Sequence, residues 1–145
     1  MTNAKLAVIV AVVGLVGLSL LGCGEEQAKE YEMPIDLVRA FDASMKSGNF
    51  QRAAGLFDFE EHERNINPAF DSLPIGEREM KIKTLRDQKA RALEGWASEY
   101  ISANYQIGQE YRKDDISKIS LVGSLPKRVT CINKRDVSWR IYLIE

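Results

Sequence analysis

The first 24 residues differ from the rest of the chain in the distribution of charged and apolar positions. Lys5 is the only charged side chain before Glu25, and residues 6–21 form an apolar run without a charge. A short basic start, an apolar run and then small residues are typical of an export signal rather than of a folded element. We therefore predict that residues 1–22 are a signal peptide.

From residue 34 the apolar positions follow a helical period. Pro34 suits the first turn of a helix, where its missing backbone N–H breaks no hydrogen bond. Gly48 can end this helix in a left-handed conformation, and Asn49 can cap a second, shorter helix. The inward positions of the first helix are Leu37, Val38, Phe41, Ser44 and Met45, and those of the second are Phe50, Ala53, Ala54 and Phe57.

Residues 58–76 contain acidic residues, asparagines and two prolines, and we interpret them as an irregular connection. A connection of this length can contain a hidden helical turn. From Glu77 the helical period returns, and acidic residues at the start complement the helix dipole. The apolar stripe of this third predicted helix consists of Ile82, Leu85, Ala92, Leu93 and Trp96.

After Trp96 the period changes to alternation, which predicts strands. The alternating residues are Ile101, Ala103, Tyr105, Ile107 and Tyr111, then Ile119, Leu121 and Leu125, then Val129 and Cys131, and finally Val137, Trp139, Ile141 and Leu143. We predict an α+β domain over residues 34–145, in which three N-terminal helices pack on a curved, mainly antiparallel sheet of about four strands. Residues 23–33 are polar and predict a flexible tether.

The segment Leu20-Leu21-Gly22-Cys23 indicates where the signal peptide ends. It resembles the lipobox of bacterial lipoproteins, which has an aliphatic residue three positions before Cys and a small residue directly before it. The resemblance implies that the Cys23 thiol is lipid-modified and that a peptidase cuts after Gly22. This covalent lipid would anchor the mature chain to a membrane.

An uncleaved membrane anchor is the alternative interpretation of the same segment. As a helix, residues 6–21 reach about 24 Å, short of a hydrocarbon core of about 30 Å, although the next three residues nearly close the gap. In both cases Lys5 stays on the cytoplasmic side, so the rest of the chain lies outside the cytoplasm. Gly24 stands where inner-membrane lipoproteins typically carry Asp. The resemblance therefore implies the outer membrane, facing the periplasm, if the cell has one.

Both ends of the predicted domain resemble a known family. The segments are Pro34-Ile35-Asp36-Leu37-Val38-Arg39-Ala40-Phe41, Lys46-Ser47-Gly48-Asn49-Phe50, Ala53-Ala54-Gly55-Leu56 and Ser138-Trp139-Arg140-Ile141-Tyr142-Leu143. They are similar to nuclear-transport-factor-2-like domains, which have a cone-shaped, cystatin-like fold. The resemblance implies a curved sheet that can close over a pocket, and it says little about function.

Charge and residue types argue against several function classes. The formal net charge is −1, so no basic excess favours a nucleic-acid partner. His62 is the only histidine and lies in a charged stretch that we interpret as surface. With Cys23 lipidated, Cys131 is the only remaining thiol, whereas a zinc site needs three or four ligands. We therefore expect no metal and no cofactor other than the lipid.

Five residues are candidates for a ligand pocket. Trp96, Tyr105, Tyr111 and Trp139 face the concave side of the sheet if the alternation is right, where they pack the core or line a pocket. Lys89 falls inside the apolar stripe of the third helix. Its ammonium either reaches water while its stem stays buried, or points into the cone toward a carboxylate or an anionic ligand.

These observations predict a membrane-anchored, non-enzymatic lipoprotein of the cell envelope that binds a small ligand or a protein partner. One alternative is an enzyme of the same fold that uses a polar pair inside the cone. The other is a structural envelope accessory without a pocket.

Replacing Cys23 with serine tests the predicted anchor. Cys23→Ser should leave the precursor uncut and unlabelled by radioactive palmitate, because the acceptor thiol is missing. Labelling of cells followed by gel electrophoresis measures both properties. A mutant that is still labelled and cut at the same bond would show that Cys23 is not the acceptor.

Overall fold

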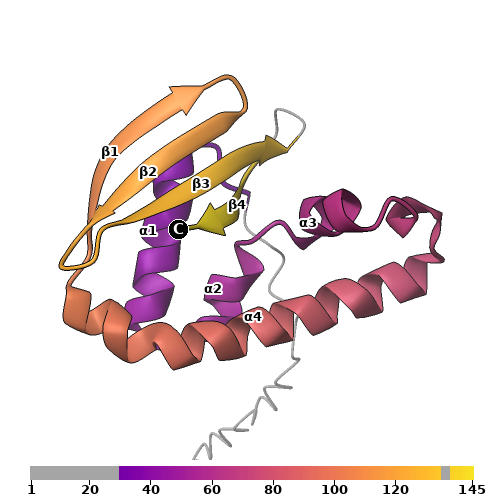
Figure 1. Ribbon diagram of the computed structural model, residues 1–145, viewed down its shortest axis with the longest axis horizontal. Coiled ribbons are helices and arrows are strands. Elements are labelled where there is room, and N and C mark those ends of the chain that lie inside the picture. The colour runs from indigo at the N-terminus through magenta and orange to yellow at the C-terminus, as the bar shows by residue number, and fades with distance from the viewer. Residues whose placement is uncertain (1–29, 135–137) are drawn as a thin grey trace, which may run out of the picture.

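Four antiparallel strands, paired in the order β1-β2-β3-β4, form one sheet that curves over helix α1 (Figure 1). The computed structural model describes residues 30–134 and 138–145, so the predicted signal peptide, Cys23 and Val137 lie outside the described residues. An α+β fold with a four-stranded antiparallel sheet is confirmed. The elements are α1 (Pro34–Lys46), α2 (Phe50–Gly55), α3 (Phe59–Ile66), the 3-10 helix η1 (Phe70–Ser72), α4 (Ile75–Ala103), β1 (Gln106–Lys113), β2 (Ile116–Val122), β3 (Lys127–Lys134) and β4 (Ser138–Ile144).

Helix α1 fills the concave side of the sheet with the residues that the helical pattern predicted. Leu37, Val38 and Phe41 are fully buried, and Pro34 lies in the first turn. Gly48 follows the helix with a φ of +73°, a left-handed conformation that side chains with a Cβ rarely adopt. The predicted start, buried face and end of this helix are confirmed.

Helix α2 is capped as predicted and leads into the edge of the sheet. The backbone N–H of Arg52 donates to the side chain of Asn49 at 3.1 Å. Beyond α2 the chain runs parallel to β4, where Phe57 and Ile141 form a bridge. The Ile141 N–H donates to the Leu56 carbonyl at 2.9 Å, which fixes this segment beside the last strand.

The prediction of an irregular connection over residues 58–76 is wrong, because α3 and η1 lie within it. Asp58 caps α3 by accepting a hydrogen bond from the Glu61 N–H at 3.0 Å. The helix was missed because it is short and charged, so that capping rather than apolar periodicity marks it. The described residues therefore contain four α-helices and η1, not the three helices predicted.

Helix α4 is longer than predicted at both ends, and the strand expected from Ile101 is wrong. The helix runs through Ala103 and ends at Asn104, which has a φ of +49°. Tyr100 and Ala103 are buried and continue the helical face, whereas Ile101 is 56% exposed. Ile101 and Ala103 imitate an alternating pattern, but burial of Tyr100 against the domain extends the helix past them.

The N-terminal half of α4 projects beyond the sheet, with α3 and η1 beside it, and we call these three segments the arm (Figure 1). Phe70 of η1 is buried. Lys81 of α4 pairs with the buried carboxylate of Glu63 on α3, with Nζ 2.6 Å from Oε2. Within the described ranges, no helix combines the length and apolarity needed to cross a bilayer.

A bulge in β1 changes the side on which its residues point. Ile107 pairs with Leu121 and Glu110 with Ile119, so β1 advances three residues while β2 advances two. The extra residue reverses the alternation beyond it. Tyr111, predicted to face the concave side, is therefore on the outer face and 68% exposed.

A second bulge, in β4, changes the end of the sheet in the same way. Cys131 pairs with Ile141, whereas Val129 pairs with Ile144. Ile144 therefore lies on the inner face, and Leu143, predicted to point inward, is 44% exposed. Val129 and Cys131 are fully buried as predicted, and burial raises the pKa of the Cys131 thiol to about 12.

Phe41→Ala tests the core of the domain. Every described member of the core lies at or after Tyr31, so the chain Gly24–Glu145 keeps this core and should fold on its own. In this chain Phe41→Ala should lower the free energy of unfolding by about 3–5 kcal/mol, because it leaves a cavity among buried rings. Urea unfolding followed by circular dichroism measures the change.

Ile101→Ala is the matched control, since Ile101 is exposed on α4. It should change the free energy of unfolding by about 0.5 kcal/mol or less. A loss below about 1 kcal/mol for Phe41→Ala would contradict the central position of the inner face of α1.

Candidate functional site

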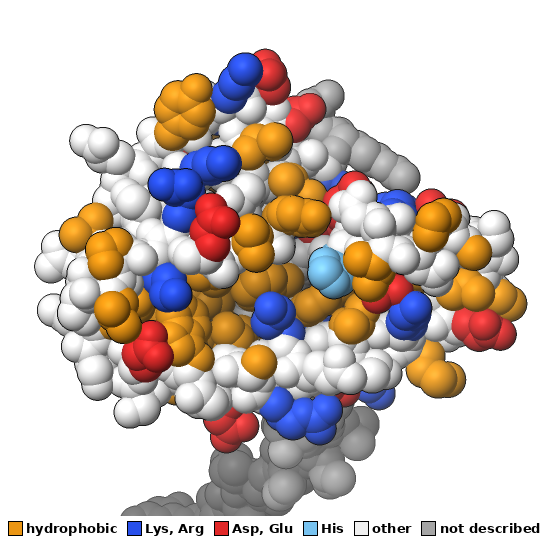
Figure 2. Space-filling view, in the orientation of Figure 1, with side chains coloured by type: hydrophobic (Ala, Val, Ile, Leu, Met, Phe, Trp, Pro, Cys, Tyr) orange, Lys and Arg blue, Asp and Glu red, His pale blue; other side chains and the backbone are white. Residues whose placement is uncertain are grey.

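An apolar groove of about 300 Å³ opens between helix α4 and the last strand of the sheet. Figure 2 shows hydrophobic side chains gathered in the hollow between the sheet and α4. The groove draws on the segment after α2 and on α4, β3 and β4. Its lining residues are Phe57, Lys89, Ala92, Leu93, Trp96, Lys127, Tyr142, Leu143 and Ile144.

Each wall of the groove follows from a local feature of the sequence. Lys89, Leu93 and Trp96 are four and three residues apart, so they lie on one face of α4. Phe57 is held opposite this face by its bridge with β4. The bulge in β4 places Ile144 on the inner side of the sheet, where it packs against the core.

Lys89 brings a charge to the apolar surface of the groove. Its side chain is half-buried, and its Nζ lies 4.8 Å from the centroid of the Phe57 ring. Among the described residues no carboxylate forms an ion pair with it. Burial lowers the pKa of the ammonium. The ring of Phe57 is therefore the close neighbour of the ammonium.

A second lysine, which the sequence analysis did not single out, approaches the groove from the sheet. Lys127 is half-buried and pairs in register with Leu121, which is fully buried. Directly opposed residues of an antiparallel pair project to the same face, so Lys127 projects to the inner side. Its alternation with Val129 and Cys131 is the sequence signal that could have found it.

Two other partly buried lysines have buried acidic partners. Lys81 pairs with Glu63, and Lys134 Nζ lies 3.6 Å from Oδ1 of Asp58. Glu63 and Asp58 are 2% and 6% exposed. No acidic residue lines the groove, so its two lysines form no such pair within the described part of the chain.

Only two of the five predicted pocket residues, Lys89 and Trp96, line the groove. Tyr105 and Trp139 are each 2% exposed and belong to the core. Tyr111 lies on the outer face of the sheet because of the β1 bulge. The structure therefore does not bring these five side chains together around one cavity.

The two buried aromatics have structural partners of their own. The Tyr105 hydroxyl donates to the carbonyl of Leu125 at 2.6 Å, and Leu125 lies in the loop after β2 rather than in the predicted strand. The centroid of the Trp139 ring lies 4.7 Å from Cζ of Arg112. The backbone N–H of Trp139 donates to the backbone carbonyl of Tyr31 at 2.9 Å, so this contact with the domain lies inside the predicted tether.

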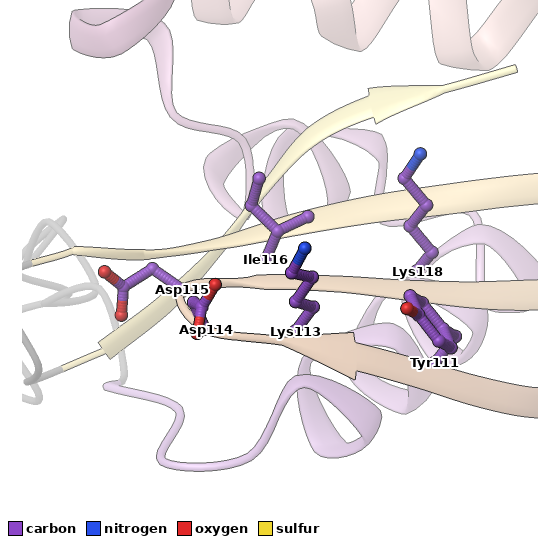
Figure 3. A pocket seen from close by; sticks show the side chains of 6 residues that line it. All are labelled: Tyr111, Lys113, Asp114, Asp115, Ile116 and Lys118. Carbon is purple, nitrogen blue, oxygen red and sulfur yellow. The ribbon is translucent and has the colours of Figure 1, made fainter.

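A second hollow, of about 530 Å³, lies at the turn between β1 and β2 (Figure 3). It is lined by Tyr111, Lys113, Asp114, Asp115, Ile116 and Lys118. All six side chains are exposed and come from one hairpin, and acidic and basic groups are mixed. Because small-molecule sites are usually concave and bury most of their ligand, we take the groove beside α4 as the candidate site.

The described residues contain one histidine and no cluster of metal-ligating side chains. His62 is exposed, as predicted. No group of three His, Cys, Asp or Glu side chains in the described ranges could hold a metal ion. A buried hydroxyl, Ser117 Oγ, donates to Glu110 Oε1 at 2.8 Å, but neither residue lines the groove.

Searches of protein-family models, of curated proteins and of solved structures found no match for this chain. The function is therefore inferred from the residues of the groove and from the sequence pattern that precedes the domain.

Lys89→Met tests the surroundings of the ammonium in the chain Gly24–Glu145. Methionine keeps an apolar stem and removes the charge. Loss of the contact with the Phe57 ring should destabilise the variant, whereas removal of a half-buried charge should stabilise it. Because these two effects oppose each other, the free energy of unfolding should change by less than about 1 kcal/mol. As the matched control, Lys81→Met leaves Glu63 buried without its partner and should cost about 3 kcal/mol or more.

Urea unfolding of both variants at several pH values measures these effects. The pKa of Lys89 is lowered in the folded state, so above this pKa the folded protein loses a proton that the unfolded chain still binds. Wild type should therefore gain stability relative to Lys89→Met as the pH rises from the pKa of the folded state to that of the unfolded chain, about 10.4. Equal losses in the two variants at neutral pH would contradict the absence of a carboxylate partner for Lys89.

Proposed function

We propose that this chain is a membrane-anchored, non-enzymatic lipoprotein of the cell envelope that binds a small ligand in the groove beside α4. The observation that carries the proposal is the groove itself, whose walls are apolar except for two lysines and a tyrosine. Apolar walls with a few polar groups are typical of small-molecule sites. The membrane anchor comes from the lipobox at Cys23.

The proposal includes the nuclear-transport-factor-2-like fold that the sequence resembles. Two features support it: helices α1 and α2 precede the sheet, and the antiparallel sheet curves around α1. A fold of this kind serves many functions, so the ligand must be sought from the groove.

The polar groups of the groove favour binding over catalysis. They are the ammonium groups of Lys89 and Lys127 and the hydroxyl of Tyr142. General acid–base chemistry is carried most often by His, and also by carboxylates, Lys or Tyr near the reacting atoms. The groove has no described histidine or carboxylate, and among the described residues neither of its lysines has an ion pair that would orient it for proton transfer, so binding is the function that these side chains support best.

Filling the groove tests the proposal. Ala92 lines the groove and is exposed on α4, whereas Ser98 is exposed on the same helix outside the groove. We would purify the full lipoprotein from membranes as wild type, Ala92→Trp and Ser98→Trp, and analyse solvent extracts by mass spectrometry. A small molecule should be enriched with wild type and Ser98→Trp and be lost with Ala92→Trp.

Equal extracts from all three proteins would contradict ligand binding in the groove. That result would direct attention to the arm, where apolar side chains are exposed without cover in the described structure. They are Ile66, Ile75 and Met80, with exposures of 63%, 66% and 70%.

A further inference from the structure

We infer that the ligand of the groove is an amphipathic organic anion, with one acidic head and an aliphatic or aromatic body. This inference deepens the proposed function and rests on it. The head binds between Lys89 and Lys127, and the body lies against Leu93, Trp96 and Ile144.

The two lysines approach the groove from opposite walls. Lys89 lies on α4, and Lys127 is the first residue of β3. Both are half-buried and neither has an ion pair within the described residues. A carboxylate, sulfonate or phosphate head would offset the positive charge of the groove and accept charge-assisted hydrogen bonds from an ammonium group.

Glu145, the acidic residue that follows the lining residue Ile144, is engaged elsewhere. Its Oε1 lies 3.6 Å from NH1 of Arg128, and the two residues also exchange backbone hydrogen bonds of 2.7 and 3.0 Å. Arg128 follows Lys127, and successive strand side chains point to opposite faces. The Glu145 carboxylate therefore pairs on the outer side, and no other carboxylate of the described residues lines the groove.

The rest of the lining determines the body of the ligand. Leu93 is 5% exposed at the base, and Phe57, Trp96 and Ile144 are partly buried and packed against the core. These walls offer van der Waals contact and few hydrogen bonds. With about 300 Å³, the groove is at the small end of the range for ligand sites. Two cations and apolar walls suit a single acidic head better than a polyanion.

Two dyes that differ in one charged group test the inference. The anion 8-anilino-1-naphthalenesulfonate and the neutral N-phenyl-1-naphthylamine share the same aromatic body, and both fluoresce in apolar sites. We would titrate each into the chain Gly24–Glu145, with folding checked by circular dichroism. Wild type should bind the anion at least about tenfold more tightly than the neutral dye, a difference of about 1.4 kcal/mol.

Substitutions of the two lysines locate the effect. Lys89→Met and Lys127→Met should each weaken binding of the anionic dye several-fold and leave the neutral dye within about twofold, since the apolar walls remain. The controls Lys83→Met and Lys118→Met remove exposed lysines outside the groove. They should leave the affinity for both dyes unchanged.

The outcomes separate this inference from the proposed function. If Ala92→Trp abolishes binding of the neutral dye but the lysine variants do not affect the anion, the groove binds ligands and the inference of an anionic ligand is wrong. If neither dye binds, or if Ala92→Trp leaves both affinities unchanged, the proposed binding function of the groove is wrong. If Lys83→Met weakens binding of the anionic dye as much as Lys89→Met and Lys127→Met do, the dye is attracted by positive surface charge in general. That result would overturn the inference.

Discussion

Tyr100 is the residue at which helix α4, helix α1 and the sheet meet. Its side chain is fully buried, and its ring centroid lies 6.0 Å from that of Phe41 on α1 and 5.0 Å from that of Tyr105, which precedes β1. Its hydroxyl donates to Asp42 at 2.9 Å, and burial together with this bond raises its pKa. Because these contacts fix the direction of α4, they determine both where the arm projects and how Trp96, 5.0 Å away, stands over the groove.

The parts of the fold that depend on local chemistry could be predicted from the sequence. Pro34 starts α1 and Asn49 caps α2 whatever surrounds them. The errors arise where pairing between distant segments decides the outcome. One extra residue in a strand exposes Tyr111 and Leu143, and alternation within a single strand carries no sign of it. Ile101 was placed in a strand because it alternates with Ala103. The packing of α4 against α1, which extends the helix past both residues, cannot be deduced from the sequence around Ile101.

The side of the candidate site that α4 forms could be predicted from the sequence, and the side that the sheet forms could not. Lys89 and Trp96 lie on one helix, so their spacing alone places them on a common face. Lys127 and Ile144 reach the same groove through strand pairing, and Phe57 reaches it through the bridge that follows α2. Tertiary structure brings these residues together over long sequence separations, and only knowledge of the register could have assembled them.

The proposed anchor and the proposed ligand constrain each other. Tyr31 is already bound to the domain through Trp139, so seven residues, 24–30, separate it from a lipid on Cys23. Fully extended, the eight steps from Cys23 to Tyr31 span about 26–29 Å. An anchored domain would therefore stay within about one domain diameter of the bilayer, where molecules with an apolar body and an acidic head are concentrated at the interface. A groove that combines Trp96 and Leu93 with two lysines matches such molecules in both parts. The same side chains far from a membrane would meet them only at low concentration.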